Sequence, residues 1–221
     1  MTNLRDFSGE DPSPFADNHP ARDCRDRLIG ATLNLCTGRG YEATTVDQIA
    51  AAAGLTPRDF ARYFATKDAV LMSIVDDVLE ATAVALRSVD AAASPEQALL
   101  IATTAVLTAI IEGRGVITRD RMHAIAPIIG AQPNLRRQAS LARKRVLAPA
   151  VADRMGLGAE NPRVRRAVSM WSAIAAIAEV GSRSMTAYDD LRQDDRLSER
   201  VAAQLAAIFA EVMGKAPWEQ V

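Results

Sequence analysis

The chain has 221 residues, a length sufficient for one large or two small domains. Of these residues, 49% are apolar and 5% are aromatic. Its net charge of −1 excludes a general basic coat as a means of binding nucleic acid, so any such binding must depend on local charge. No apolar run approaches the roughly 20 residues that span a bilayer, and no secretory signal is visible, so we expect a soluble, cytoplasmic protein that does not enter a membrane.

Residues 1–20 hold three prolines together with Ser, Asp and Gly, and they carry one base and four acids. Such a composition buries too little apolar surface to fold by itself. We therefore predict a flexible N-terminal arm. An arm that reaches into a DNA groove is the alternative, but the single base, Arg5, and the net negative charge disfavour it.

The segment after the arm is predicted to begin with a helix that holds both cysteines, Cys24 and Cys36. Twelve residues of helix rise about 18 Å, whereas a disulfide needs Cα atoms within about 7 Å. The two cysteines therefore cannot bridge within that helix. No metal-ligand spacing joins them to His19 or His123, and we expect no metal and no cofactor.

Residues 44–67 begin with a short helix that carries its own start and stop signals. Thr45 is followed three residues later by Gln48, which is the spacing of a capping box, and apolar residues then recur at helical spacing. Gly54 follows where the chain must turn through a left-handed conformation. A second helix is expected directly after this turn.

That second helix has Thr56 as its N-cap and Pro57 at its first position, where a missing N–H group costs nothing. Phe60 and Phe64, four residues apart, are predicted to face inward. The residues left to face outward are basic or carry a hydroxyl group: Arg58, Arg62 and Tyr63. The pattern predicts a helix-turn-helix, which places one helix in the major groove of DNA. An ordinary helical hairpin is the alternative.

Residues 28–71 resemble the DNA-binding domain of the tetracycline-repressor (TetR) family. The matching residues are Leu28-Ile29-Gly30-Ala31, Leu35, Arg39-Gly40-Tyr41, Thr44-Thr45-Val46, Ile49-Ala50, Ala53-Gly54-Leu55, Tyr63-Phe64, Lys67 and Leu71. The helical pattern along the chain, with no competing strand pattern, predicts an all-α protein of about nine helices, and the resemblance implies how they are divided. The N-terminal three-helix domain would bind DNA, and a C-terminal helical domain would bind a ligand and dimerise.

By position, the resemblance also implies which side chains reach DNA. Contacts to the DNA backbone are implied for Thr45, Thr56, Tyr63 and Lys67. Pro57, Arg58 and Arg62 would lie nearest the base edges.

The sequence departs from the family pattern at three positions. Ala61 replaces a tyrosine and so lacks one usual phosphate contact, and Cys36 replaces a phenylalanine of the first helix. Asp59 stands where a small or hydroxyl residue is common. Its carboxylate could accept a hydrogen bond from a cytosine amino group, but the position favours capping of the helix.

The remaining chain is alanine-rich, and every segment after about residue 92 is typical of helix. The expected helices follow Ser94-Pro95, span about 120–129, run from Pro133 to about Met155, start at Asn161-Pro162, and end with a last helix near 201–212. We divide the chain into an arm (1–20), a helix-turn-helix domain (21–67), an effector-binding and dimerisation domain (68–214) and a tail (215–221).

The last two helices are the predicted dimer surface, because small residues on one would allow a partner helix to approach closely. The candidates are Ser169, Ala173, Ala176, Val201, Leu205, Ile208, Phe209 and Val212. Packing within the same subunit is the alternative. A dimer would read a palindrome with half-sites roughly 34 Å or more apart.

A ligand pocket is expected among the middle helices. Its candidate lining is aliphatic or sulfur-bearing, with two polar-tipped members: Val106, Ile110, Met122, His123, Ile125, Met170, Trp171, Ile174 and Ile177. Such a lining favours an apolar ligand over a sugar or nucleotide, although each of these residues could equally belong to a core.

Residues 132–166 carry nine bases and two acids. They form either a solvated helix face paired with acids such as Asp189 and Asp194, or a site for an anionic ligand with an apolar tail, such as a fatty acid or acyl-CoA.

These patterns predict a dimeric, ligand-responsive transcriptional regulator that acts as a repressor at a palindromic operator. We expect no enzyme, because the sequence offers no nucleophile with a base, metal cluster or phosphate loop. A helical adaptor with degenerate DNA binding is the alternative.

Overall fold

The computed structural model describes residues 19–184 together with residues 207 and 210. Eight helices follow one another in this part of the chain: α1 (His19–Arg39), α2 (Val46–Ala52), α3 (Pro57–Tyr63), α4 (Lys67–Leu86), α5 (Pro95–Ile111), α6 (Arg119–Ala131), α7 (Pro133–Met155) and α8 (Pro162–Ser184). The predicted all-α class is confirmed, and the described ranges contain no strand. Of the expected ninth helix, near 201–212, only residues 207 and 210 are described, and both are helical.

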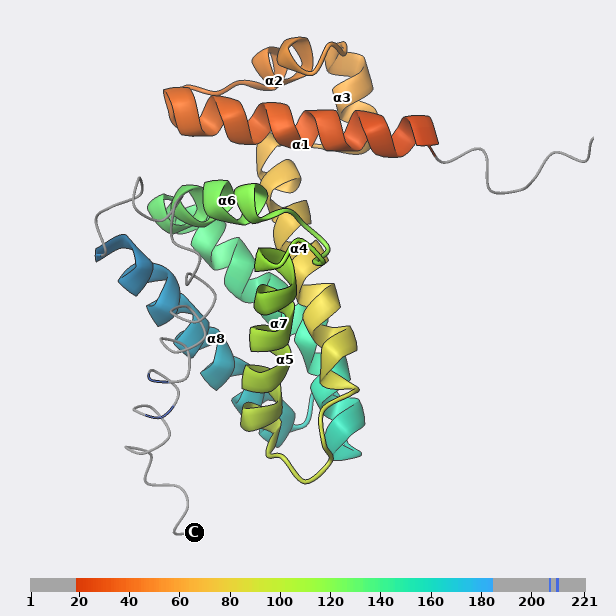
Figure 1. The fold of residues 1–221 in the computed structure, drawn as a ribbon, viewed down its shortest axis with the longest axis vertical. Coiled ribbons are helices and arrows are strands. Elements are labelled where there is room, and N and C mark those ends of the chain that lie inside the picture. Colours follow the sequence, from red (N-terminus) through yellow and green to blue (C-terminus); the bar gives the residue numbers. More distant parts are fainter. Residues whose placement is uncertain (1–18, 185–206, 208–209, 211–221) are drawn as a thin grey trace, which may run out of the picture.

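The helices form a small end unit and a larger body (Figure 1). Helices α1, α2 and α3 make up the end unit, and α4 leads from it into the body beside α5 and α7. Helix α8 packs on α7 and α5. Helix α6 lies across the body next to α1. Because α4 belongs to both parts, it connects them mechanically. The first helix begins at His19, so the last two residues assigned to the arm are helical.

Helix starts in this protein are set by short polar side chains. Thr45, Thr56, Thr66, Ser94 and Thr118 each accept a hydrogen bond from a backbone N–H three residues ahead, at the starts of α2, α3, α4, α5 and α6. These bonds satisfy donors that a helix start leaves unpaired. The N-caps predicted at Thr45, Thr56 and Ser94 are confirmed.

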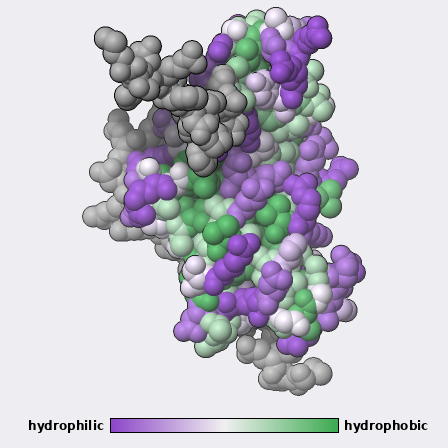
Figure 2. Space-filling model, turned by 90° about the vertical axis from the view of Figure 1, so that its right-hand side faces the viewer, coloured by the Kyte–Doolittle hydropathy of each residue, from purple (hydrophilic) through white to green (hydrophobic). Residues whose placement is uncertain are grey.

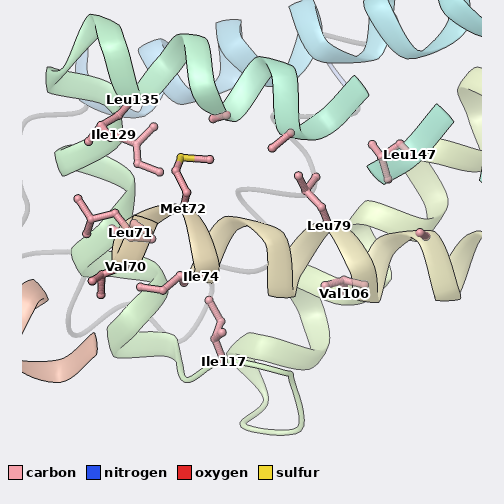
Figure 3. Close-up of a cluster of buried hydrophobic side chains, with 14 of the residues drawn as sticks. Val70, Leu71, Met72, Ile74, Leu79, Val106, Ile117, Ile129, Leu135 and Leu147 are labelled. Carbon is pink, nitrogen blue, oxygen red and sulfur yellow. The ribbon is translucent and has the colours of Figure 1, made fainter. Parts of the chain in front are cut away.

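One continuous apolar core runs along α4 through the body. Near the start of α4, Leu71 and Met72 pack close to Ile129 of α6 and Leu135 of α7 (Figure 3). Burial of such side chains stabilises the fold by about 1.5–3 kcal/mol each relative to exposure. Among the described residues, no helix is both long and apolar enough to cross a membrane.

Candidate nucleic-acid interface

The first helix of the predicted motif, α2, begins with a complete capping box. The Gln48 N–H donates to Thr45 Oγ1 at 3.3 Å, and the Thr45 N–H donates to Gln48 Oε1 at 3.1 Å. Ile49 and Ala50 are fully buried. The local sequence therefore both starts this helix and fixes the side that packs inward.

The turn between α2 and α3 is held from outside the motif. Gly54 has φ +65°, a conformation that side chains other than glycine rarely adopt. The Arg27 guanidinium of α1 donates to the Ala53 carbonyl and, at 3.3 Å, to the Gly54 carbonyl. A Cβ atom at Gly54 would lie 2.8 Å from Arg27 Nη2. The turn thus requires glycine for its conformation and for this close approach.

The start of α3 shows what Asp59 does. Its carboxylate accepts from the Thr56 N–H at 3.1 Å and from the Thr56 hydroxyl at 2.7 Å, while the Asp59 N–H donates to Thr56 Oγ1 at 3.1 Å. These bonds lower the pKa of Asp59, with smaller contributions from Arg62 and Arg58. The interpretation of Asp59 as a helix cap is confirmed.

Two aromatic rings anchor α3 to the end unit. Phe60 and Phe64 are buried, with ring centroids 6.1 Å apart and planes tilted by 50°. The Arg25 guanidinium of α1 lies 5.9 Å from the Phe64 ring centroid, within the range of a cation–π contact. The predicted inward face of α3 is confirmed, and its opposite face is left exposed.

The exposed face of α3 holds the predicted base-reading residues. Pro57, Arg58, Ala61 and Arg62 are all exposed. Arg58 and Arg62 are four residues apart and so lie on one side of the helix. Thr45 and Thr56 are exposed at the starts of α2 and α3.

Tyr63 and Lys67 are more constrained than the other predicted contacts. Tyr63 is half-buried, and burial followed by a hydrogen bond with Cys24 raises its pKa. Lys67 Nζ donates to the carbonyls of Tyr41 at 2.7 Å and Thr44 at 3.0 Å. Two of its three N–H groups are therefore used within the protein, which leaves one for a phosphate oxygen.

The residues predicted to line a pocket come together between α5, α6 and α8. Five of them are buried in the apolar core: Val106, Ile110, Ile125, Trp171 and Ile174. Met122, His123 and Met170 are half-buried, and the side chain of Ile177 is outside the described residues. The hydroxyl of Thr103 on α5, which sequence reasoning missed, is buried without a hydrogen-bond partner among the described residues.

A groove of about 700 Å³ lies elsewhere, between α1, α4 and the segment after α5. Its lining is charged and aliphatic: Arg22, Arg25, Asp26, Asp77, Glu80, Ala81, Val84, Ala85 and Val116. It contains none of the predicted pocket residues, so the pocket stays a prediction. Figure 2 shows hydrophobic residues interspersed with hydrophilic ones across the middle of the face that it draws.

The predicted dimer surface is only partly within the described residues. Ser169 and Ala173 are exposed on α8, four residues apart. Ala176 lies further along the same helix. The other five candidates (Val201, Leu205, Ile208, Phe209 and Val212) fall outside the described residues.

Several members of the basic cluster have structural roles. Arg154 donates to the carbonyls of Val89 and Ala93 at 3.0 and 2.9 Å, and also to that of Asp90, which fixes the loop between α4 and α5. Arg145 pairs with Asp76 at 2.7 Å. Arg143 is buried, with 6% of its surface exposed. The cluster is therefore only partly available to a ligand.

Known proteins resemble the N-terminal part of the chain in sequence and most of the chain in fold. Residues 28–74 match the family described as bacterial regulatory proteins, tetR family. The HTH-type transcriptional regulator TcmR of Streptomyces glaucescens is 41% identical over 92 residues, which are 42% of this chain and 41% of TcmR. The chain thus aligns with about two fifths of the length of that relative.

Solved structures match most of the chain at low identity. SmeT, the repressor of the Stenotrophomonas maltophilia multidrug efflux pump SmeDEF, has a TM-score of 0.55 and 18% identity, over 87% of this chain and 91% of SmeT. The fatty acid degradation regulator FadR from Bacillus halodurans has a TM-score of 0.50 and 17% identity, over 94% and 99% of the two chains. At such identities the likeness establishes the fold.

The end unit defines a helix-turn-helix domain of the class found in bacterial regulatory proteins, tetR family. Residues 28–74 thus match the N-terminal domain of the tetR family of bacterial regulatory proteins, and the fold is similar to that of SmeT.

Proposed function

We propose that the protein is a dimeric repressor that binds a palindromic operator through α3 and releases it when an apolar small molecule binds in the body. The exposed face of α3 carries this proposal. Arg58 and Arg62 lie there together, on a helix fixed from behind by the buried rings of Phe60 and Phe64. Arginine is the side chain that most often reads guanine in the major groove.

Selection of binding sites from random DNA tests this role. We expect a palindrome, with affinity that falls steeply with salt because phosphate contacts release counterions. Arg58→Ala should weaken binding to the selected site and relax its sequence preference by about 1–3 kcal/mol at one position. Arg87→Ala, at the exposed far end of α4, is the matched control and should leave binding unchanged.

Lys67 provides a second contrast. Its ammonium group is bonded to two carbonyls, so Lys67→Ala should weaken binding on every sequence through loss of a phosphate contact and a looser segment before α2. If selection yields no enriched palindrome, the helical adaptor becomes the better description of the protein.

The effector would occupy the region between α5, α6 and α8. Support comes from the aliphatic side chains gathered there, with the buried Thr103 hydroxyl as a polar group for a ligand. We propose a fatty acid or an acyl-CoA. Arg137, Lys144, Arg163 and Arg165 are exposed and could meet carboxylate or phosphate groups.

Calorimetry with palmitate and palmitoyl-CoA tests the ligand class. Met122 is half-buried on α6, and the larger ring in Met122→Trp should fill the space proposed for the ligand and block binding. Val84→Trp, on the exposed side of α4, should leave binding unchanged. Lys144→Ala should weaken binding of palmitoyl-CoA more than of palmitate. If neither palmitate nor palmitoyl-CoA produces heat, this effector class is excluded.

A further inference from the structure

Asp68, the second residue of α4, uses both carboxylate oxygens to connect three parts of the protein. Its Oδ1 accepts a hydrogen bond from the Tyr41 hydroxyl. Its Oδ2 accepts from Asn134 Nδ2 and from Gln138 Nε2, each at 3.0 Å. Tyr41 lies between α1 and α2, whereas Asn134 and Gln138 belong to α7 in the body.

On the side of the end unit, the contact reaches the start of α2. Lys67 Nζ lies 4.0 Å from the centroid of the Tyr41 ring and is bonded to the carbonyls of Tyr41 and Thr44. Thr44 directly precedes the N-cap of α2. Burial and the bond to Asp68 raise the pKa of Tyr41. Asp68 and Lys67 together therefore position the segment from which α2 begins.

On the side of the body, the contact sets the position of the first turns of α7. Gln132, the N-cap of this helix, makes no capping bond with its side chain. Asn134 and Gln138 lie four residues apart on one side of the helix. Leu135, between them, is fully buried near Met72 of α4 (Figure 3). The polar bonds to Asp68 thus lie at the edge of the α4–α7 packing and fix its register.

We propose that Asp68 is a positioning residue that couples the first turns of α7 to the helix-turn-helix, so that a shift of α7 against α4 changes the placement of α2. This inference rests on the proposed function, because it concerns how the body influences DNA binding. Coupling of this kind is reciprocal: DNA that fixes the end unit must also stabilise the start of α7.

The other polar links between the two parts are weaker candidates. Arg121 of α6 pairs with Asp26 of α1 at 3.0 Å, and Arg25 of α1 pairs with Asp77 of α4 at 3.4 Å. The Arg121–Asp26 pair is exposed to solvent, where an ion pair contributes little. The Arg25–Asp77 pair is half-buried, but it joins α1 to α4 and does not reach α7. Arg121→Ala is therefore a matched control, because it removes another polar contact between the body and the end unit and leaves the bonds of Asp68 in place.

Hydrogen exchange in the peptide covering residues 133–142, with and without the selected operator, tests the proposal. Each variant is measured at a DNA concentration that saturates it. In the wild type, DNA should slow exchange by about fivefold or more, the lower end of typical coupling between sites. Tyr41→Phe and the double variant Asn134→Ala with Gln138→Ala cut the link from its two ends, and both should lose the response. Arg121→Ala should keep it.

Substitution of Asp68 itself separates coupling from simple loss of structure. Asp68→Asn keeps an oxygen for the α7 amides, and its new NH₂ group can donate to the Tyr41 oxygen, so part of the response should return. Asp68→Ala offers neither contact and should abolish it.

A full response in Asp68→Ala or Tyr41→Phe, an equal loss in Arg121→Ala, or an unresponsive wild type would each overturn the inference while operator binding stands. Failure to select any DNA would instead overturn the proposed function, and the inference with it.

Discussion

The α2–α3 motif and the packing between α5, α6 and α8 are both helical, but they are held together in different ways. In the motif, each helix start is closed by a side chain three residues away, as between Thr56 and Asp59. In the body, buried residues from distant parts of the chain, such as Ile110 and Ile174, belong to one apolar core. The first kind of structure is local and the second is not, so mutations should distinguish them.

The largest effect is expected from Phe60→Ala, which removes the buried ring that anchors α3. It should lower the free energy of unfolding by about 3–5 kcal/mol and abolish operator binding. Ile110→Ala in the body should cost about 2–5 kcal/mol. Urea denaturation measures both, and Arg58→Ala, on the exposed face of α3, should change stability by less than about 0.5 kcal/mol. A small effect of Phe60→Ala would mean that α3 does not depend on its buried face.

Gly54→Ala should have the next largest effect. The left-handed backbone costs a residue with a side chain about 1–2 kcal/mol, and the new Cβ atom would also displace Arg27. Gly38→Ala, on α1 with open space around it, is the control and should be neutral or slightly stabilising. Thermal unfolding compares the two, and equal melting temperatures would show that the turn tolerates another conformation.

Removal of a helix cap should cost less and tests whether the two regions differ in function. Thr56→Ala and Thr118→Ala, at the starts of α3 and α6, should each destabilise the protein by about 1 kcal/mol. Only Thr56→Ala should also weaken operator binding, as a fluorescence anisotropy titration would measure. Equal loss of DNA affinity in both variants would mean that caps act only through global stability.

The smallest effect concerns pH. The pKa of Asp59 is lowered in the folded protein, so its ionised form contributes stability above the pKa it has when unfolded. This contribution is lost as pH falls through the lower, folded pKa. The difference in unfolding free energy between wild type and Asp59→Asn should therefore be constant above about pH 5 and shrink in acid. A difference that does not change with pH would contradict this role of the charge.

The sequence predicted the motif well because its signals are short-range. Capping residues, the glycine turn and the i,i+4 pair Phe60 and Phe64 can all be recognised within a few positions. Arg27 was missed because it donates to backbone carbonyls 26 and 27 residues away, and no sequence pattern marks such an acceptor. The same reason hid Arg154, whose carbonyl partners lie more than 60 residues away.

For the ligand pocket in the body, the sequence predicted the kind of residues in the lining but not whether they enclose a cavity. Aliphatic residues such as Val106 and Ile125 have the same spacing whether they fill a core or line a cavity, and the structure brings both into the apolar core. The partners of Asp68 were equally hidden, because a carboxylate at the start of a helix is expected there for the helix dipole alone.

The shared carboxylate of Asp68 also has an evolutionary consequence. One side chain satisfies a hydroxyl and two amides that come from positions 41, 134 and 138. A change at position 68 therefore leaves the half-buried Tyr41 and Gln138 and the exposed Asn134 without this acceptor. These four positions should therefore covary among relatives, with an apolar residue at 68 accompanied by loss of the polar groups at the other three.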